Sequence, residues 1–286
     1  MRKLLLLVFG TLGVLGSTAL AQSSIQAKTE LPLFFYQGDQ PKLQFVLHNT
    51  SSQEITGNLQ LELFDAAKKQ PVDGWFYNQL ANQYFTLGAG ERTVVRFPVT
   101  IPHIFIGSVD WQLTVRVDSM QQLLRGNFNV RNAEQQETSG QDYTNTLKGN
   151  IWLISVQKNS AKPVVETPIT PFSTQPIGQP VVLRFTIVID KKTDSCRVLL
   201  PISAGLQSTD NSVSIKKGKP RSIIQKPKSD TAISMTLYGL TPGVYQWDYP
   251  FTARYPGEFL VPACHLLLFN ATRRVFRTGT SSILID

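Results

Sequence analysis

The sequence predicts an all-β protein made of two antiparallel β-sandwich domains joined by a polar linker. Many segments of strand length alternate apolar and polar residues, which buries one face of a strand and exposes the other. Turn signals rich in glycine, proline and asparagine separate these segments, and no long segment with a helical period lies between them. Closely spaced strands of this kind are typical of sandwiches.

The first 21 residues are typical of a secretory signal peptide. The basic start Met1–Lys3 precedes the apolar run Leu4–Leu15, and Ala19-Leu20-Ala21 has the small residues of a cleavage site. We therefore expect an exported protein, periplasmic or secreted. No later apolar run approaches the roughly 18 residues of a transmembrane helix, so we expect no membrane-spanning segment.

The remaining chain divides into a domain of residues 22–130, a linker of residues 131–146 and a domain of residues 147–286. The first domain contains alternating segments such as "KLQFVLHN", "GNLQLELFD" and "VDWQLTVRVD". The linker, "RNAEQQETSGQDYTNT", has one aromatic and no large aliphatic residue, so it buries too little apolar area to fold. Alternation then resumes in "PVVLRFTIVID", "AISMTLYGL" and "GVYQWDYPFTAR".

Positive charge gathers in the second half of the chain. The whole chain has a formal charge of +8, residues 22–146 carry −3 and residues 147–286 carry +9. Much of this excess lies between Ile215 and Asp230, in Lys216, Lys217, Lys219, Arg221, Lys226 and Lys228. The segment is either a solvated loop or a site for an anionic partner or surface. It has no aromatic residue on which bases could stack, and with export this argues against nucleic acid.

Two cysteines and one aromatic stripe are the other candidate sites. An exported chain can bridge Cys196 and Cys264 by a disulfide, although each can also be a small buried apolar residue. In "GVYQWDYPF" the rings of Tyr245, Trp247 and Tyr249 share one face of a strand. This stripe either stacks on sugar rings or packs in the core.

The chemistry of catalysis is not apparent in the sequence. No metal-ligand spacing, phosphate-binding loop or nucleophile motif occurs, so we expect no catalytic residues, no metal and no cofactor. One enzymatic alternative remains, a cysteine hydrolase using Cys264, and it requires an accessible thiol of low pKa.

The order of several motifs resembles the bacterial alpha-2-macroglobulin family. In the first half "LPLFFYQGDQPKLQFVLHNT" and "PVDGWFYNQLANQYFTLGAGE" are similar to its macroglobulin-type domain. In the second half "LPISAGL", "TLYGLTPGVYQWDYPFTARYPGEFLVPA" and "FNATRRVFRTGTS" are similar to its C-terminal macroglobulin domain. The resemblance implies two immunoglobulin-like macroglobulin domains.

One departure from the family limits what the resemblance implies. The family has a thioester domain with a Cys-Gly-Glu-Gln motif between these sandwiches, whereas here they are separated by the polar linker and no such motif occurs. The resemblance therefore implies a non-enzymatic, peptidase-inhibitor-like interaction module without covalent trapping. The expected partner is a protease or a full-length macroglobulin, and the alternative is a sandwich that binds carbohydrate or a cell surface.

Overall fold

The computed structural model describes residues 24–132, 149–157, 165–169, 173–209, 214–225, 231–269, 274–278 and 280–286. The predicted signal peptide, and the predicted linker from residue 133 on, lie outside these ranges. The described residues form strands, turns and bends without a helix, so the predicted all-β class is confirmed. In the described part of the chain, no helix has the length and hydropathy needed to cross a membrane.

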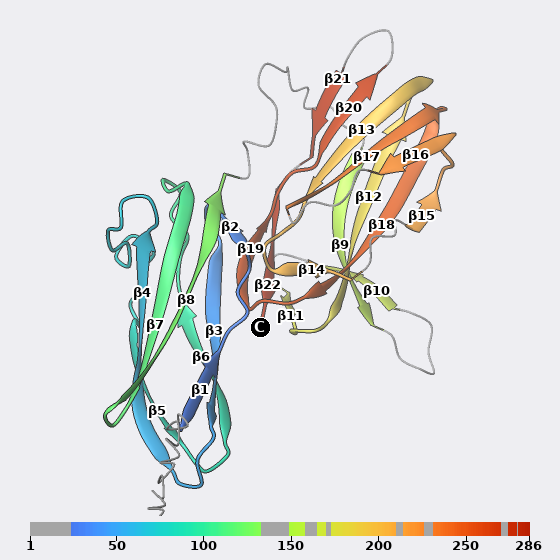
Figure 1. The fold of residues 1–286 in the computed structure, drawn as a ribbon. Helices are drawn as coiled ribbons and strands as arrows, with labels where there is room; N and C mark the ends of the chain where they lie inside the picture. Colours follow the sequence, from blue (N-terminus) through green and yellow to red (C-terminus); the bar gives the residue numbers. More distant parts are fainter. Residues whose placement is uncertain are drawn as a thin grey trace, which may run out of the picture.

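The first sandwich packs a five-stranded sheet against the part of a six-stranded sheet that contains β1, β3 and β6 (Figure 1). The five-stranded sheet has the order β2 (Phe34–Tyr36), β8 (Met120–Arg131), β7 (Gly107–Val117), β4 (Ile55–Asp65) and β5 (Asn82–Leu87). Opposite it, β3 (Gln40–Asn49) lies between β1 (Ile25–Lys28) and β6 (Arg92–Pro98). Alternate residues of β3 are buried, and the Phe45 ring contacts Phe97 and Trp111 edge to face, at 5.6 Å between centroids.

The second sandwich is built from two further sheets (Figure 1). One has the order β10 (Val165–Pro168), β9 (Gly149–Gln157), β12 (Pro180–Ile189), β18 (Gly243–Ala253) and β14 (Leu206–Ser208), and β15 (Ser214–Lys217) also pairs with β18. The other has the order β16 (Ser222–Gln225), β17 (Ala232–Leu240), β13 (Thr193–Pro201), β20 (His265–Phe269) and β21 (Arg274–Arg277).

Three strands from the second half of the chain extend a sheet of the first sandwich. β19 (Gly257–Val261) pairs with β3 and with β22 (Ser281–Ile285), which pairs with β11 (Thr174–Gln175). Gly257 faces Pro41 in this pairing, and the Lys42 N–H donates to the Pro256 carbonyl at 2.9 Å. Gly257 has φ of +135°, and an added Cβ would lie 2.5 Å from the Gln40 oxygen. The junction therefore requires glycine at this position.

Phe259 and Asp39 connect the two sandwiches through buried contacts. The Phe259 ring stacks on Phe35 of the first sandwich, and its other neighbour is Gly205, where an added Cβ would lie 2.4 Å from the ring. The Asp39 carboxylate accepts hydrogen bonds from the Leu260 N–H at 2.7 Å and the Tyr36 N–H at 2.8 Å. Burial raises the pKa of Asp39 from its ordinary 3.8 to about 7, although both hydrogen bonds act to lower it.

Candidate interaction site

The aromatic stripe of β18 lies in the core of the second sandwich. Tyr245, Trp247 and Tyr249 are buried. The Trp247 ring stacks between Phe185 at 5.7 Å and Tyr245 at 6.0 Å, measured between centroids. The interpretation as an exposed sugar-binding surface is therefore wrong, because all three rings are buried and the backbone at Gly218 packs against Tyr245. The structure shows the alternative interpretation, in which these rings belong to the core.

The basic segment follows an edge of the second sandwich and crosses from one sheet to the other. β15 pairs with β18, whereas β16, a few residues later, pairs with β17 of the opposite sheet. The exposed cations of this crossing are Lys216, Lys217, Lys219 and Arg221, while Lys226 and Lys228 lie outside the described residues. The Lys216 Nζ is 3.8 Å from Asp248 Oδ2, and Asp248 also forms a bidentate ion pair with Arg184. An anionic partner for this segment stays a prediction.

Both cysteines are buried and free. β13 pairs Cys196 with Leu268, which is four residues after Cys264, so Cys264 lies roughly 13 Å along the strands from Cys196. A disulfide needs Cα atoms within about 7 Å, which explains why the predicted bridge is not formed. Burial raises the pKa of Cys196 to about 12 and the pKa of Cys264 well above its usual value. A buried protonated thiol lacks the accessible thiolate that the cysteine-hydrolase alternative requires.

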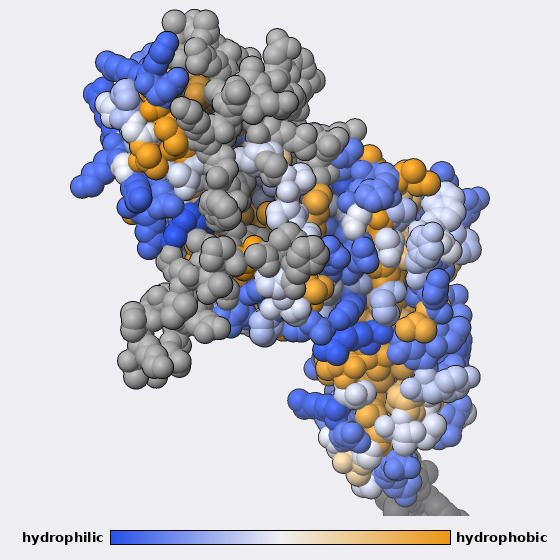
Figure 2. Space-filling model, turned by 180° about the vertical axis from the view of Figure 1, so that it is seen from behind, coloured by the Kyte–Doolittle hydropathy of each residue, from blue (hydrophilic) through white to orange (hydrophobic). Residues whose placement is uncertain are grey.

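An exposed apolar patch lies on two loops at one end of the first sandwich. The loop of residues 66–81 follows β4 and the loop of residues 99–106 precedes β7, both at the upper end of this sandwich in Figure 1. Four large side chains are exposed there: Trp75 at 54%, Tyr77 at 63%, Ile104 at 85% and Ile106 at 54%. We call these four residues the end-loop patch. Figure 2 shows hydrophobic residues at this end of the first sandwich and along the face below it.

The two loops are joined by the buried phenylalanines between the exposed side chains. Phe76 lies between Trp75 and Tyr77, and Phe105 lies between Ile104 and Ile106. Their rings meet edge to face at 5.3 Å, and the Thr100 N–H donates to the Phe76 carbonyl at 2.8 Å. The buried rings therefore anchor the loops, and the exposed residues point away from the anchor.

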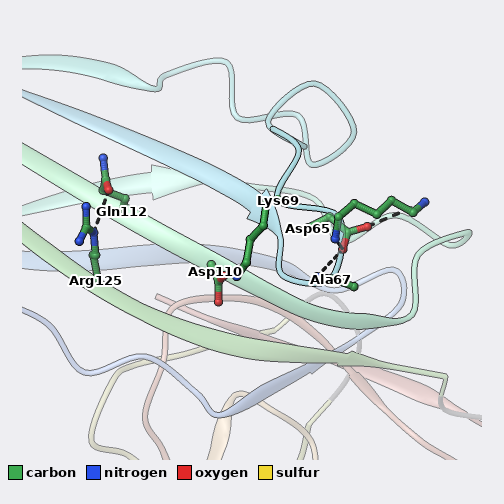
Figure 3. Close-up of polar contacts among 7 residues, drawn as sticks. Asp65, Ala67, Lys69, Asp110, Gln112 and Arg125 are labelled. Carbon is green, nitrogen blue, oxygen red and sulfur yellow. Dashed lines mark hydrogen bonds and ion pairs between the residues drawn. The ribbon is translucent and has the colours of Figure 1, made fainter.

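Hydrogen bonds to side chains fix the path of the longer loop. Asp73 Oδ1 accepts from the Leu63 N–H at 3.1 Å and from Asn78 Nδ2 at 2.7 Å. At the start of the loop, Asp65 Oδ1 accepts from the Ala67 N–H at 2.9 Å, and Lys69 forms an ion pair with Asp110 (Figure 3). These bonds fix the loop before a partner is present, which lowers the entropic cost of binding.

Tyr77 has an unusual backbone conformation within this patch. Its φ is +50°, in the left-handed region that bulky residues seldom adopt. Backbone strain of this kind persists where the surrounding structure enforces it, and it is concentrated at binding and active sites. Here the neighbouring Phe76 anchor and the Asp73–Asn78 hydrogen bond enforce it.

The sequence analysis did not select the end-loop patch as a site. The signal available was "DGWFYN", three consecutive aromatics between turn residues. An alternating strand cannot bury three consecutive side chains on one face, so at least one of them must point elsewhere. Which of the three rings is buried depends on the contact with Phe105, which is distant in the sequence.

Comparisons with known proteins agree with this architecture. The described residues form two mainly antiparallel β-sandwiches, which place the chain in the class of all-β proteins. Residues 154–267 match the family model described as "Bacterial Alpha-2-macroglobulin MG10 domain". This part of the second half of the chain is therefore similar to the MG10 domain of bacterial alpha-2-macroglobulins, in agreement with the resemblance predicted from the sequence.

Two solved structures share the fold over most of the chain. The first is native alpha-2-macroglobulin from Escherichia coli, spanning domain MG7 to the C-terminus, with a TM-score of 0.61 at 7% identity over 92% of this chain and 99% of that one. The second is a mutant of Salmonella alpha-2-macroglobulin, with a TM-score of 0.59 at 7% identity over 92% of this chain and 41% of that one. At this identity the likeness concerns the fold alone. No curated protein matches the chain by sequence.

Proposed function

We propose that this chain is an exported, non-enzymatic protein-interaction module of the alpha-2-macroglobulin type, and that its end-loop patch contacts the partner. The observation that carries the proposal is the exposure of Trp75, Tyr77, Ile104 and Ile106 on loops anchored by Phe76 and Phe105. Tryptophan and tyrosine are the residues that most often dominate the free energy of protein association. A contiguous exposed apolar patch on a folded domain is a common mark of an interface.

The MG10 match supports a protein as the partner. We propose a protease or a full-length alpha-2-macroglobulin as the first candidates. Because the chain has no Cys-Gly-Glu-Gln motif, any inhibition of a protease would depend on noncovalent occlusion. The proposed compartment is the periplasm or the cell exterior, based on the apolar run at residues 4–15 and the cleavage pattern at Ala19–Ala21.

The test uses the secreted protein with two exposed aromatics removed. Partners are captured from the periplasmic fraction by crosslinking, identified, purified, and titrated against the wild type and the W75S/Y77S variant. We expect at least about tenfold weaker binding for this variant, because each truncated aromatic hot spot costs 1–2 kcal/mol or more. Purified alpha-2-macroglobulin and a broad-specificity protease are titrated in the same way.

The matched control is Tyr84→Ser on β5. Tyr84 is more exposed than the patch aromatics but lies outside the end loops. The control variant should bind as the wild type does. Equal affinity of the wild type and W75S/Y77S for every captured partner, or no saturable partner for the wild type, would reject the proposal.

A further inference from the structure

A cleft of about 870 Å³ lies beside the junction of the two sandwiches, away from the end loops. One wall is the outer face of β1 and β3, which presents Lys28 and Val46. The facing wall comes from the second half of the chain, with Ile177 and Tyr255. The volume is within the usual range of ligand-binding clefts.

The cleft exists because residues 28–33 leave β8 without a strand partner over part of its length. Before this segment the Ala27 N–H donates to the Gln122 side chain at 3.0 Å, and after it Phe34 pairs with Asn129. Between these points the described residues form no strand pairing with this edge of β8. The Thr29 hydroxyl donates to the Gln44 carbonyl at 2.5 Å, which draws the segment toward β3. A gap therefore opens beside Leu124 and Arg125.

Trp111 forms the floor of this gap. It faces Gly126 across the β7–β8 pairing, and an added Cβ at Gly126 would lie 2.5 Å from the indole ring. Glycine is therefore required for the ring to occupy this place. The indole is 7% exposed, and its N–H has no hydrogen-bond acceptor among the residues that the structure describes. Together with Leu124 and Val46 it offers an apolar floor that contains one unused donor.

The charged groups of the cleft are mainly cations. Lys28, Arg125 and Arg254 line it together with a single carboxylate, Glu30, which forms an ion pair with Arg254. Arg125 Nε donates to Gln112 Oε1 at 2.9 Å (Figure 3), and its other donors have no partner in the described part of the chain. Lys28 likewise has no ion pair with any described residue. Arg125 shares a face of the β7–β8 pairing with Gln112, opposite to the face of Trp111, so Lys28 is the cation that the cleft offers to a ligand.

We infer that this cleft binds an extended acidic peptide segment of a partner protein, with an apolar side chain over Trp111 and a neighbouring carboxylate held by Lys28. A peptide is favoured because the unpaired edge of β8 supplies backbone hydrogen-bonding groups along the same gap. A carboxylate is favoured because cations dominate the lining and charge-assisted hydrogen bonds are the stronger kind. The inference rests on the proposed function in that the ligand belongs to a protein.

The first test is a titration with a defined peptide. A fluorescent peptide of sequence Gly-Asp-Leu-Asp-Leu-Gly, blocked at both ends, is followed by anisotropy at low and moderate salt. We expect saturable binding that weakens as salt rises, and at least about tenfold weaker binding when lysine replaces both aspartates. Equal binding of the acidic and basic peptides, or no saturation at millimolar protein, would overturn the inference.

Two variants locate the site. K28Q should bind the acidic peptide at least about tenfold more weakly, while K192Q, which removes one charge from an exposed position outside the cleft, should bind as the wild type does. Trp111→Phe keeps a ring on the floor but removes the N–H donor, and we expect a several-fold loss. Unchanged binding by K28Q in a folded protein would place the peptide elsewhere and overturn the inference.

Failure of this inference and failure of the proposed function are distinguishable. W75S/Y77S leaves the cleft intact, so it should bind the acidic peptide as the wild type does. If W75S/Y77S loses its partner and the cleft variants bind the peptide normally, the interaction module stands without this site. If the peptide binds the cleft and W75S/Y77S retains every partner, the end-loop patch is excluded and the cleft stands.

Discussion

The two sandwiches use similar aromatic sequences in opposite ways. In the second sandwich, "GVYQWDYPF" places its alternate rings under the opposite sheet, where Trp247 is stacked on both sides. In the first, "DGWFYN" buries only the middle ring and leaves Trp75 and Tyr77 in solvent. The difference shows that an aromatic-rich segment becomes core or surface according to what lies opposite it.

The sandwiches also close their edges differently. The second uses its own chain, since the segment from β15 to β16 crosses from one sheet to the other. The first is extended by β19, which comes from the second half of the chain. Each of the following predictions tests one side of this comparison.

The largest effect on the free energy of unfolding is expected for the buried rings of β18. Trp247→Ala removes a fully buried ring from between two others, and we expect a loss of about 4 kcal/mol in the free energy of unfolding. Guanidinium denaturation followed by circular dichroism measures it. A loss below about 1 kcal/mol would mean that this stripe is not core.

The second largest effect on the free energy of unfolding is expected for β19, the strand that extends the first sandwich. Phe259→Ala removes a buried ring that lies between Phe35 and Gly205, and we expect a loss of about 3 kcal/mol. Hydrogen exchange should show faster exchange in β3 as well as in β19, because the two strands pair. Glu258→Ala, at an exposed position of the same strand, is the control and should change neither quantity appreciably. Faster exchange confined to β19 would show that the first sandwich does not depend on this strand.

Asp39 adds a dependence on pH at the same junction. Its pKa is raised in the folded state, so its contribution to stability is full below about pH 4 and is lost as pH rises through about 7. Asp39→Asn cannot titrate. The stability of the wild type relative to this variant should therefore fall by about 2 kcal/mol between pH 5 and pH 8. Denaturation curves at both values measure this, and a difference that grows with pH would contradict the assignment.

The smallest effect on stability is expected in the end-loop patch. Trp75→Ala removes an exposed ring, and we expect a change within about 0.5 kcal/mol in the free energy of unfolding. Thermal denaturation measures it alongside Trp247→Ala. If the two variants lose similar stability, the contrast between the buried and exposed aromatics does not hold.

Local pattern was sufficient to predict the strands but not all of their partners. Residues 40–49 alternate as expected, and the strand forms with alternate residues buried. The segment "GEFLVPACHLLLF" reads as one continuous apolar run, yet the structure divides it into β19 and β20, in different sheets. Alternation reports which side of a strand is buried, but it does not report which strand lies beside it.

The candidate sites depended even more on distant contacts. Lys216, Lys217, Lys219 and Arg221 are exposed, as charged residues in a glycine- and proline-containing loop usually are. Cys196 and Cys264 could not be assigned from spacing, because only the pairing of β13 with β20 shows their separation. The cleft around Trp111 depends on Gly126 and on the path of residues 28–33, and neither has a signature in the sequence.

The pairing of β3 with β19 has a consequence for how fast the chain folds. The Leu260–Asp39 hydrogen bond spans 221 residues of sequence, and the Arg254–Glu30 ion pair spans 224. Contacts of such long range close large loops and slow folding. Until β19 arrives, the start of β3 at Gln40 and Pro41 lacks this strand partner, and unpaired strand edges of folding intermediates favour aggregation. Chaperone protection during folding would therefore matter most before this strand has paired.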